Sequence, residues 1–229
     1  MKAFDSLCGT FLNYDSVAVD VGANIGVTAM ILAAYCHSVI AIEPGPKIYK
    51  ILRGNLESNG LNHVLAINSA VGKEKSRQGN IQVNFNERSA YGHIIDVSNM
   101  AGDETNAKVK LETLDAIVRD ACLTKVDFVK IDVEGYEQDV LMGASKTLSL
   151  FTPLVFLEFN SWCLIAFRNQ NPRIFLDYLF DTFTYRYYPT TKGLVQITKI
   201  GWLHQNLTTG CVGNLLLTND KRRLEAPHA

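Results

Sequence analysis

The sequence has little of what would mark a disulfide-stabilised, zinc-binding or membrane-spanning protein. Its five cysteines are scattered without a C-x-x-C pair, and an odd number argues against a complete disulfide framework. None of its five histidines lies at metal-ligand spacing from another. No apolar run approaches the length that a bilayer requires, and the first residues carry no secretory signal. These absences predict a reduced, cytoplasmic protein without a membrane span.

Charge of neither sign dominates the chain, whose formal net charge is −1. The longest basic run, Lys221 to Arg223, lies in a polar tail over residues 219–229 that we interpret as a solvated terminus. Nucleic acid is therefore not expected as a partner. The chain has 229 residues, 47% of them hydrophobic, which predicts a single globular domain over residues 1–229.

Short apolar β-type runs alternate with helical patterns up to about Phe180, which predicts a mostly parallel sheet with helices on both faces. The expected parallel strands are Val17–Val21, Val39–Ile42, Val64–Asn68, Val126–Ile131 and Leu154–Phe159. The expected helices are Val27–Cys36, Ile48–Ser58, Leu114–Ala121, Glu137–Ala144 and Pro172–Asp181. Beyond these, only closing strands are expected, at least two of them antiparallel: Tyr185–Tyr188, Leu194–Lys199 and Gly210–Leu217.

The most informative stretch is the turn that follows the first expected strand. It runs D-V-G-A-N-I-G from Asp20 to Gly26. Its glycines permit a sharp turn and a close approach of the backbone to a ligand, and the next helix aims free N–H groups at that ligand. Glu43 ends the second strand, where a carboxylate can accept both hydroxyls of a ribose. The pair of features predicts an adenosine-containing cofactor.

The turn also bears on which cofactor is bound. Its pattern from Gly22 is G-x-N-x-G, whereas dinucleotide sites have G-x-G-x-x-G. A pyrophosphate needs bare amides, but the ammonium of S-adenosylmethionine (SAM) gains from a carboxylate, which Asp20 supplies. SAM is therefore favoured over a dinucleotide. The plain alternative is that Asp20 only caps the helix and the glycines only make a turn.

A second acidic motif, K-I-D-V-E-G, ends the fourth expected strand. Asp132 and Glu134 are two residues apart, so on a strand they point the same way and their charges crowd. A cation, a ligand ammonium or a shared proton must offset them, and Lys130 can be that partner. Glu158 and Asn160 end the next strand and should point into the same crevice. Alternatively, Glu134 and Glu137 only serve the N-terminus of the following helix.

The segment 73–110 interrupts the alternation. Structureless loops of that length are uncommon in compact domains unless they have a function, so a hairpin and a loop over the active site are expected. Ser89, Tyr91 and His93 are its candidate acceptor-binding residues; the alternative for each is a solvated loop residue.

Taken together, the motifs resemble the FkbM family of SAM-dependent methyltransferases, over roughly residues 17–217. Besides the two motifs above, the matching strings are A-I-E-P, N-S-A-V-G, T-L-D, L-M-G-A and L-E, which begin at Ala41, Asn68, Thr113, Leu141 and Leu157. The resemblance implies a Rossmann-like class I methyltransferase fold, α/β, with a mostly parallel seven-stranded sheet, an antiparallel last strand and helices on both faces.

The resemblance also implies how the cofactor lies. The methionine part of SAM would lie against Asp20, Gly22, Asn24 and Gly26, the ribose on Glu43, and the adenine near Pro44, Ser69 and Ala70. Ser69 stands where many methyltransferases have an acidic residue that holds the adenine amino group, so that contact is expected to be weaker. Only some sixteen residues precede the first strand. The lid is therefore missing, shared with a neighbouring subunit in a homo-oligomer, or supplied by residues 73–110.

The expected reaction is transfer of the SAM methyl group to a hydroxyl oxygen. Glu134 is the candidate base and His93 the reserve, with Asp132 holding the SAM ammonium or biasing the shared proton. A divalent cation such as magnesium on Asp132, Glu134 and Glu158 is an alternative way to acidify the hydroxyl. The resemblance implies sugars, glycans or polyketides as acceptors. Two other functions stay open: a non-catalytic module that binds SAM or S-adenosylhomocysteine (SAH), and an NAD-type oxidoreductase.

Three large aromatic residues, Trp162, Phe167 and Trp202, are interpreted as core residues rather than as platforms for a sugar ring.

Overall fold

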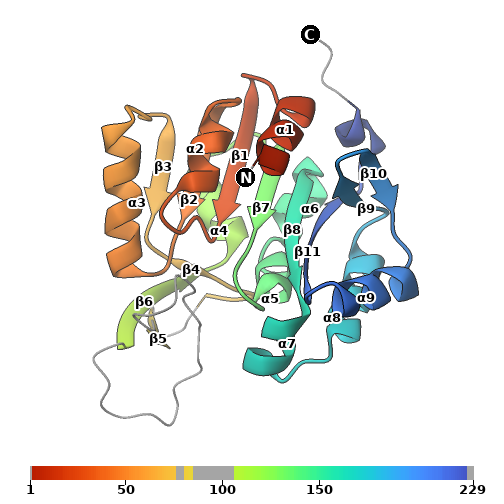
Figure 1. Cartoon of the computed structure of the whole chain (residues 1–229). Helices are drawn as coiled ribbons and strands as arrows, with labels where there is room; N and C mark the ends of the chain where they lie inside the picture. Colours follow the sequence, from red (N-terminus) through yellow and green to blue (C-terminus); the bar gives the residue numbers. More distant parts are fainter. Residues whose placement is uncertain (1, 76–79, 85–105, 226–229) are drawn as a thin grey trace.

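An eight-stranded sheet runs through the centre of the computed structural model, which describes residues 2–75, 80–84 and 106–225 (Figure 1). Its strand order is β10-β9-β11-β8-β7-β1-β2-β3. Five neighbouring strands are parallel: β3 (Val64–Ile67), β2 (Cys36–Ile42), β1 (Ser16–Val21), β7 (Phe128–Ile131) and β8 (Leu154–Asn160). All six residues of β1 are buried, as expected for a central strand that is covered on both faces.

Three antiparallel strands complete the sheet: β11 (Val212–Thr218), β9 (Tyr185–Thr190) and β10 (Gly193–Gln196). The predicted number of seven strands is corrected to eight, because β9 and β10 form a hairpin that adds a strand at the edge. The mostly parallel, Rossmann-like arrangement that the sequence predicted is confirmed.

Helices cover both faces of this sheet. One core cluster joins it to α1 (Lys2–Phe11), α2 (Val27–Ala33) and α3 (Pro46–Ser58). The other joins it to α4 (Leu114–Asp120), α5 (Glu137–Met142), α6 (Ser145–Phe151), α7 (Ser161–Arg168), α8 (Pro172–Thr182) and α9 (Lys199–Thr208). A short 3₁₀ helix, η1 (Lys221–Leu224), follows the last strand.

Several elements differ from the sequence predictions. The segment beyond residue 185 contains a helix, α9, which begins after Thr198, whose hydroxyl accepts a hydrogen bond from the N–H of Gly201. The first sixteen residues contain α1, whose Phe4, Leu7 and Cys8 lie one turn apart and are buried. The tail is also not fully solvated, because Arg223 lies 2.7 Å from Asp127 in an ion pair.

A small second sheet lies beside the first, with the order β4-β6-β5. It consists of β4 (Ala70–Val71), β6 (Asn106–Glu112) and β5 (Asn80–Asn84), and β5 pairs antiparallel with β6. The predicted acceptor residues Ser89, Tyr91 and His93 lie outside the described residues.

The topology determines where a ligand can bind. Strand β1 has β2 on one side and β7 on the other, so the chain order reverses at β1. The carboxyl ends of β1, β2, β7 and β8 all lie at one edge of the sheet, because these strands are parallel. Crevices at such a reversal are the usual ligand sites of open α/β sheets.

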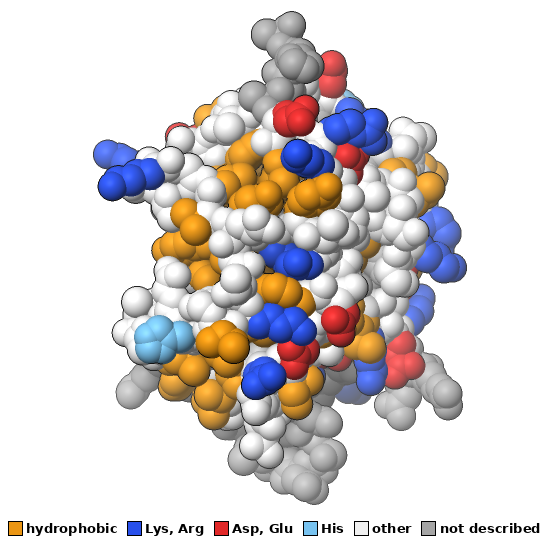
Figure 2. Space-filling view, turned by 90° about the vertical axis from the view of Figure 1, so that its right-hand side faces the viewer, with side chains coloured by type: hydrophobic (Ala, Val, Ile, Leu, Met, Phe, Trp, Pro, Cys, Tyr) orange, Lys and Arg blue, Asp and Glu red, His pale blue; other side chains and the backbone are white. Residues whose placement is uncertain are grey.

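The far end of the sheet, where β9, β10, α8 and α9 lie, presents hydrophobic side chains in patches between charged ones (Figure 2). Val195 on β10 and Ile200 on α9 are among the exposed hydrophobic residues. The homo-oligomer suggested by the sequence stays a prediction.

In the described parts of the chain, no helix combines the length and apolar character needed to cross a membrane.

A substitution at Gly143 tests how tightly the small sheet packs against the rest of the protein. A Cβ atom at this position would lie 2.0 Å from the carbonyl oxygen of Gly72, a backbone atom that no side-chain rotation can move. We expect Gly143→Ala to lower the free energy of unfolding by about 2 kcal/mol, as for other overpacked sites. Urea denaturation of wild type and variant measures this change.

Gly54→Ala is the matched control, because Gly54 lies inside α3 and a Cβ there would meet nothing within 4 Å. This control should be neutral or stabilise the protein by roughly 0.5 kcal/mol, because alanine has less chain entropy to lose. Equal stability of the two variants would contradict the packing argument.

Candidate functional site

The turn after β1 has left-handed backbone conformations, which glycine and asparagine adopt more readily than other residues. Gly22, Asn24 and Gly26 have φ values of 80°, 51° and 97°. A Cβ at Gly22 would lie 1.9 Å from the carbonyl oxygen of Asp132, and one at Gly26 would lie 2.6 Å from Leu52 Cδ1. Gly22 therefore lets the turn contact the segment after β7, and Gly26 lets it pack against α3. This close cradle fits the adenosine cofactor predicted from the sequence.

Glu43, at the end of β2, is buried and held by two backbone amides. Its Oε2 accepts a hydrogen bond from the N–H of Asn24 at 3.0 Å, and its Oε1 accepts one from Gly45 at 2.8 Å. Burial raises the pKa of the carboxyl group above its ordinary value, although these two amides oppose the shift. Each carboxylate oxygen has a second lone pair, so the group can still accept hydrogen bonds from a ligand.

Beside Glu43, the residues predicted to surround the adenine have different local roles. Ser69 is buried, and its single hydroxyl hydrogen can be donated to the carbonyl oxygen of Ala70, at 2.9 Å, or to that of Lys110, at 3.0 Å. Asn68, which the sequence analysis did not single out, donates to the carbonyl oxygens of Glu43 at 2.8 Å and Pro44 at 2.9 Å. These bonds fix the loop after β2 to the one after β3.

Lys130 links the turn to the acidic motif. Its Nζ donates to the carbonyl oxygen of Gly22 at 2.8 Å and lies 3.2 Å from Asp20 Oδ1 and 3.5 Å from Asp132 Oδ2. Burial disfavours the charged amine, but the two carboxylates outweigh this effect and raise the pKa of Lys130. Asp20 has no exposed surface, and its Oδ2 accepts a hydrogen bond from Thr28 at 2.6 Å. The charge of Asp20 is thus already paired within the protein.

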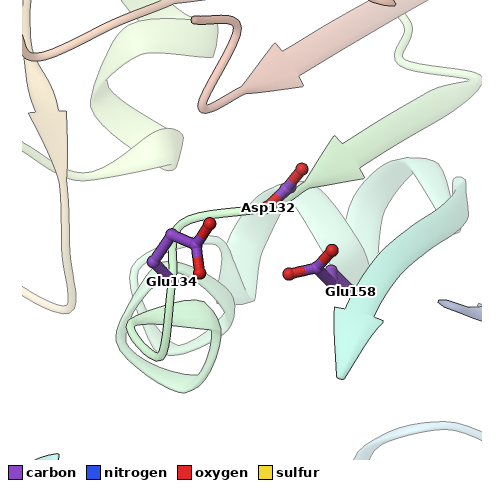
Figure 3. Close-up of side chains that lie close together, drawn as sticks. All are labelled: Asp132, Glu134 and Glu158. Atoms are coloured by element: carbon purple, nitrogen blue, oxygen red, sulfur yellow. The ribbon is translucent and has the colours of Figure 1, made fainter. Parts of the chain in front are cut away.

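Three carboxyl groups meet at the edge of the sheet, as the sequence predicted (Figure 3). Asp132 and Glu134 follow β7 and Glu158 lies on β8; one oxygen of each lies within 4.8 Å of the others. Glu134 has a φ of 54°, a left-handed conformation that is strained for a residue with a side chain. Such strain persists where surrounding contacts hold it, and here it turns the Glu134 carboxylate toward β8.

Two uncharged donors hold this acidic cluster of Asp132, Glu134 and Glu158. The amide nitrogen of Asn160 lies 3.3 Å from Glu134 Oε2 and 3.4 Å from Glu158 Oε2, while its amide oxygen accepts from the N–H of Cys163 and caps α7. The thiol of Cys163 donates to Glu134 at 2.9 Å. The thiol was missed in the sequence, because twenty-nine residues separate it from Glu134.

The pKa values of the cluster are displaced upward. Burial raises the pKa of Glu158 to about 8, with further contributions from the charges of Asp132 and Glu134. Burial also raises the pKa of Glu134, and that of Glu137 to about 7. Glu137 accepts hydrogen bonds from the N–H groups of Val133 and Gly135, so it shapes the loop after β7 as the alternative capping role suggested. Near neutral pH, the cluster can take up or release a proton.

The predictions that large aromatic residues lie in the core and that a divalent cation can bind remain to be compared with the structure. Trp202 is 2% exposed and belongs to the core, as predicted. Trp162 is 55% exposed, so its assignment to the core was wrong; it lies on α7 two residues after Asn160, with Phe167 packed edge-on against it. The carboxyl oxygens of the cluster are the kind of ligand that magnesium prefers, and the divalent-cation alternative stays a prediction.

Comparison with known proteins gives one family. The model of the family described as the Methyltransferase FkbM domain matches residues 20–184. Methyltransferase 1 of Beauveria bassiana is 26% identical over 145 residues, which cover 56% of this chain and 58% of that protein. Hexuronic acid methyltransferase AglP of Haloferax volcanii is 29% identical over 134 residues, which cover 58% of this chain and 52% of that protein. The chain thus spans only about half the length of these curated relatives.

Solved structures share the fold. A methyltransferase FkbM from Methylobacillus flagellatus superposes with a TM-score of 0.54 at 19% identity, covering 89% of this chain and 44% of that one. Protein SMU.1697c of Streptococcus mutans, solved in complex with SAH, superposes with a TM-score of 0.53 at 10% identity, covering 95% and 96%.

Removal of the Lys130 charge should destabilise the protein strongly. Lys130→Met leaves the buried carboxylate of Asp20 without its cation, which should cost about 3 kcal/mol of unfolding free energy. Adding Asp20→Asn to this variant removes the unpaired charge and should restore part of the loss. Denaturant titrations of the single and double variants measure both effects.

Lys125→Met is the control, because Lys125 forms a more exposed ion pair with Asp127 and its removal should cost less than about 1 kcal/mol. A loss for Lys130→Met no greater than that of the control would contradict the role given to the buried pair.

Stability should also depend on pH through Glu158. Its pKa is about 8 in the folded protein against 4.5 ordinarily, so the folded state keeps a proton that the unfolded chain releases. Its contribution to the free energy of unfolding therefore falls as the pH rises from about 5 to about 8. Glu158→Gln cannot ionise and should lose a few kcal/mol less than wild type over this window, because one pKa unit corresponds to about 1.4 kcal/mol.

Urea denaturation at a series of pH values measures the difference. Glu57→Gln is the control, because Glu57 is exposed on α3 beside Arg53, and it should follow the wild-type profile. Parallel profiles for wild type and Glu158→Gln would show that the carboxyl group titrates normally.

Proposed function

We propose that this chain, which belongs to the FkbM methyltransferase family, binds SAM and methylates a hydroxyl oxygen of a sugar, glycan or natural-product acceptor. The observation that carries the proposal is the contact between the glycine turn after β1 and the segment that holds the acidic cluster. A cofactor on the turn then lies beside groups that can take a proton. The name of the curated hexuronic acid methyltransferase supports a sugar acceptor.

The residues around the turn fit the parts of SAM. Gly22, Asn24 and Gly26 provide the close backbone for its methionine part, and Glu43 provides acceptors for the ribose hydroxyls. Bound SAM would supply an electrophilic methyl group on a positively charged sulfur. The Streptococcus mutans protein of the same fold, solved with SAH, supports this choice of cofactor.

The roles of the two aspartates are refined by their burial. Asp20 was expected to pair with the SAM ammonium, but it is fully buried and paired with Lys130. Asp132 keeps 37% of its side chain exposed. We therefore assign the ammonium contact to Asp132, and assign to Asp20 the placement of Lys130 and, through it, of the Gly22 carbonyl.

We assign removal of the proton from the acceptor hydroxyl to the acidic cluster. Glu134 is the candidate base, because Asn160 and Cys163 fix its Oε2 and its raised pKa suits proton uptake. An oxygen of Glu158 lies within 4.8 Å of one of Glu134, so the charges of the two groups influence each other's proton uptake. The exposed ring of Trp162, at the start of α7, is available to stack on a sugar ring of the acceptor.

Calorimetric titration and methyl transfer test the proposal together. SAM should bind saturably to the wild type, and Glu43→Ala should weaken binding about tenfold because the ribose loses its acceptor. Glu57→Ala, on the exposed face of α3, should not. Glu134→Gln should keep saturable binding but lower the transfer of labelled methyl to a panel of glycosides and glycans about a hundredfold.

Each other outcome has a distinct meaning. SAM binding without transfer to any acceptor would favour the non-catalytic SAM-binding or SAH-binding module. Absence of SAM binding would overturn the proposal itself.

A further inference from the structure

The charges of the acidic cluster are only partly offset by the cations beside it. The Nζ of Lys130 contacts Asp20 and the Gly22 carbonyl. Of the three carboxyl groups in the cluster, it forms an ion pair only with Asp132, at 3.5 Å. Arg168, whose side chain packs next to Gly135, pairs with Asp139 at 2.7 Å and stacks on the ring of Tyr136. Within residues 2–75, 80–84 and 106–225, no lysine or arginine forms an ion pair with Glu134 or Glu158.

The groups that do contact Glu134 and Glu158 carry no charge. They are the amide of Asn160, which is buried, and the thiol of Cys163. Such donors fix the positions of the carboxyl groups but leave their charge to be balanced from outside the protein. When its carboxyl groups are ionised, the cluster is therefore a negative field at partly buried positions, where screening by solvent is weak.

The field acts where a ligand on the glycine turn would lie. The Asp132 carbonyl occupies the space of a Gly22 side chain, so the first residue of the cluster touches the turn directly. The methyl donor SAM carries a sulfonium charge, and its product SAH carries a neutral thioether in the same place. The two ligands differ in charge and by one methyl group.

We infer that the acidic cluster makes this protein bind the cationic methyl donor more tightly than its neutral product. Glu134 and Glu158 are the specificity-determining residues of this preference. The inference deepens the proposed function and depends on the proposal that SAM binds the turn after β1. Its consequence is that loss of the positive charge after methyl transfer weakens the hold on the product and favours its release.

Calorimetric titrations with three ligands of nearly one shape test the inference. The ligands are SAM, SAH and sinefungin, an analogue with a protonated amine in place of the methylsulfonium group and no methyl group to transfer. At about pH 9 and with EDTA present to remove divalent cations, the wild type should bind SAM and sinefungin about tenfold more tightly than SAH. No turnover is needed for this measurement.

The double variant Glu134→Gln/Glu158→Gln keeps the shape of the cluster and removes two charges. It should bind SAH about as well as wild type does, while the SAM-to-SAH and sinefungin-to-SAH ratios should fall to about twofold or less. Glu57→Gln removes one charge on α3, away from the cluster, and should keep the wild-type ratios. If the double variant does not fold, each single variant should show an intermediate ratio.

The outcomes separate the inference from the function on which it rests. SAH bound as tightly as SAM by the wild type, or unchanged ratios in the glutamine variants, would overturn the inference and leave the proposed cofactor intact. If none of the three ligands binds, the proposed function fails, and the inference fails with it.

Discussion

The ammonium group of Lys130 is the interaction on which the arrangement of the site depends. It lies at the end of β7 and contacts the carbonyl oxygen of Gly22, the carboxylate of Asp20 and, at longer range, that of Asp132. A buried charge is costly unless its partners are close and fixed. Here the partners come from β1 and from the segment after β7, so their common cation also fixes the distance between the cofactor turn and the acidic motif. The positions of these two segments are therefore coupled.

The backbone around this cation is adapted to the same contact. Gly22 has no side chain where the Asp132 carbonyl lies, and a positive φ at Asn24 and Gly26 continues the turn toward α2. Glu134 adopts a left-handed conformation although a glycine would adopt it at lower cost. The contacts of its carboxylate with Asn160 and Cys163 help to hold Glu134 in this strained conformation.

Much of this arrangement was predictable, because strand ends in a parallel sheet meet at one edge. The runs before Asp20, Glu43, Asp132 and Asn160 are apolar and short, and their order fixes which side chains converge. The partners of those side chains were less accessible. Cys163 approaches Glu134 only because Asn160 caps α7 and sets the direction of that helix. The burial of Asp20 depends on its contacts with Lys130 and Thr28.

The two halves of the site differ in how their carboxylates are balanced. Next to the turn, Asp20 is paired with the Lys130 cation, and Glu43 is held by two backbone amides although burial still raises its pKa. At the ends of β7 and β8, Glu134 and Glu158 are held by an uncharged amide and a thiol, and burial raises their pKa values. A site that must accept a proton, and must distinguish a cation from its neutral product, needs carboxylates of the second kind. A carboxylate whose charge is already paired with a buried cation is less suited to either task.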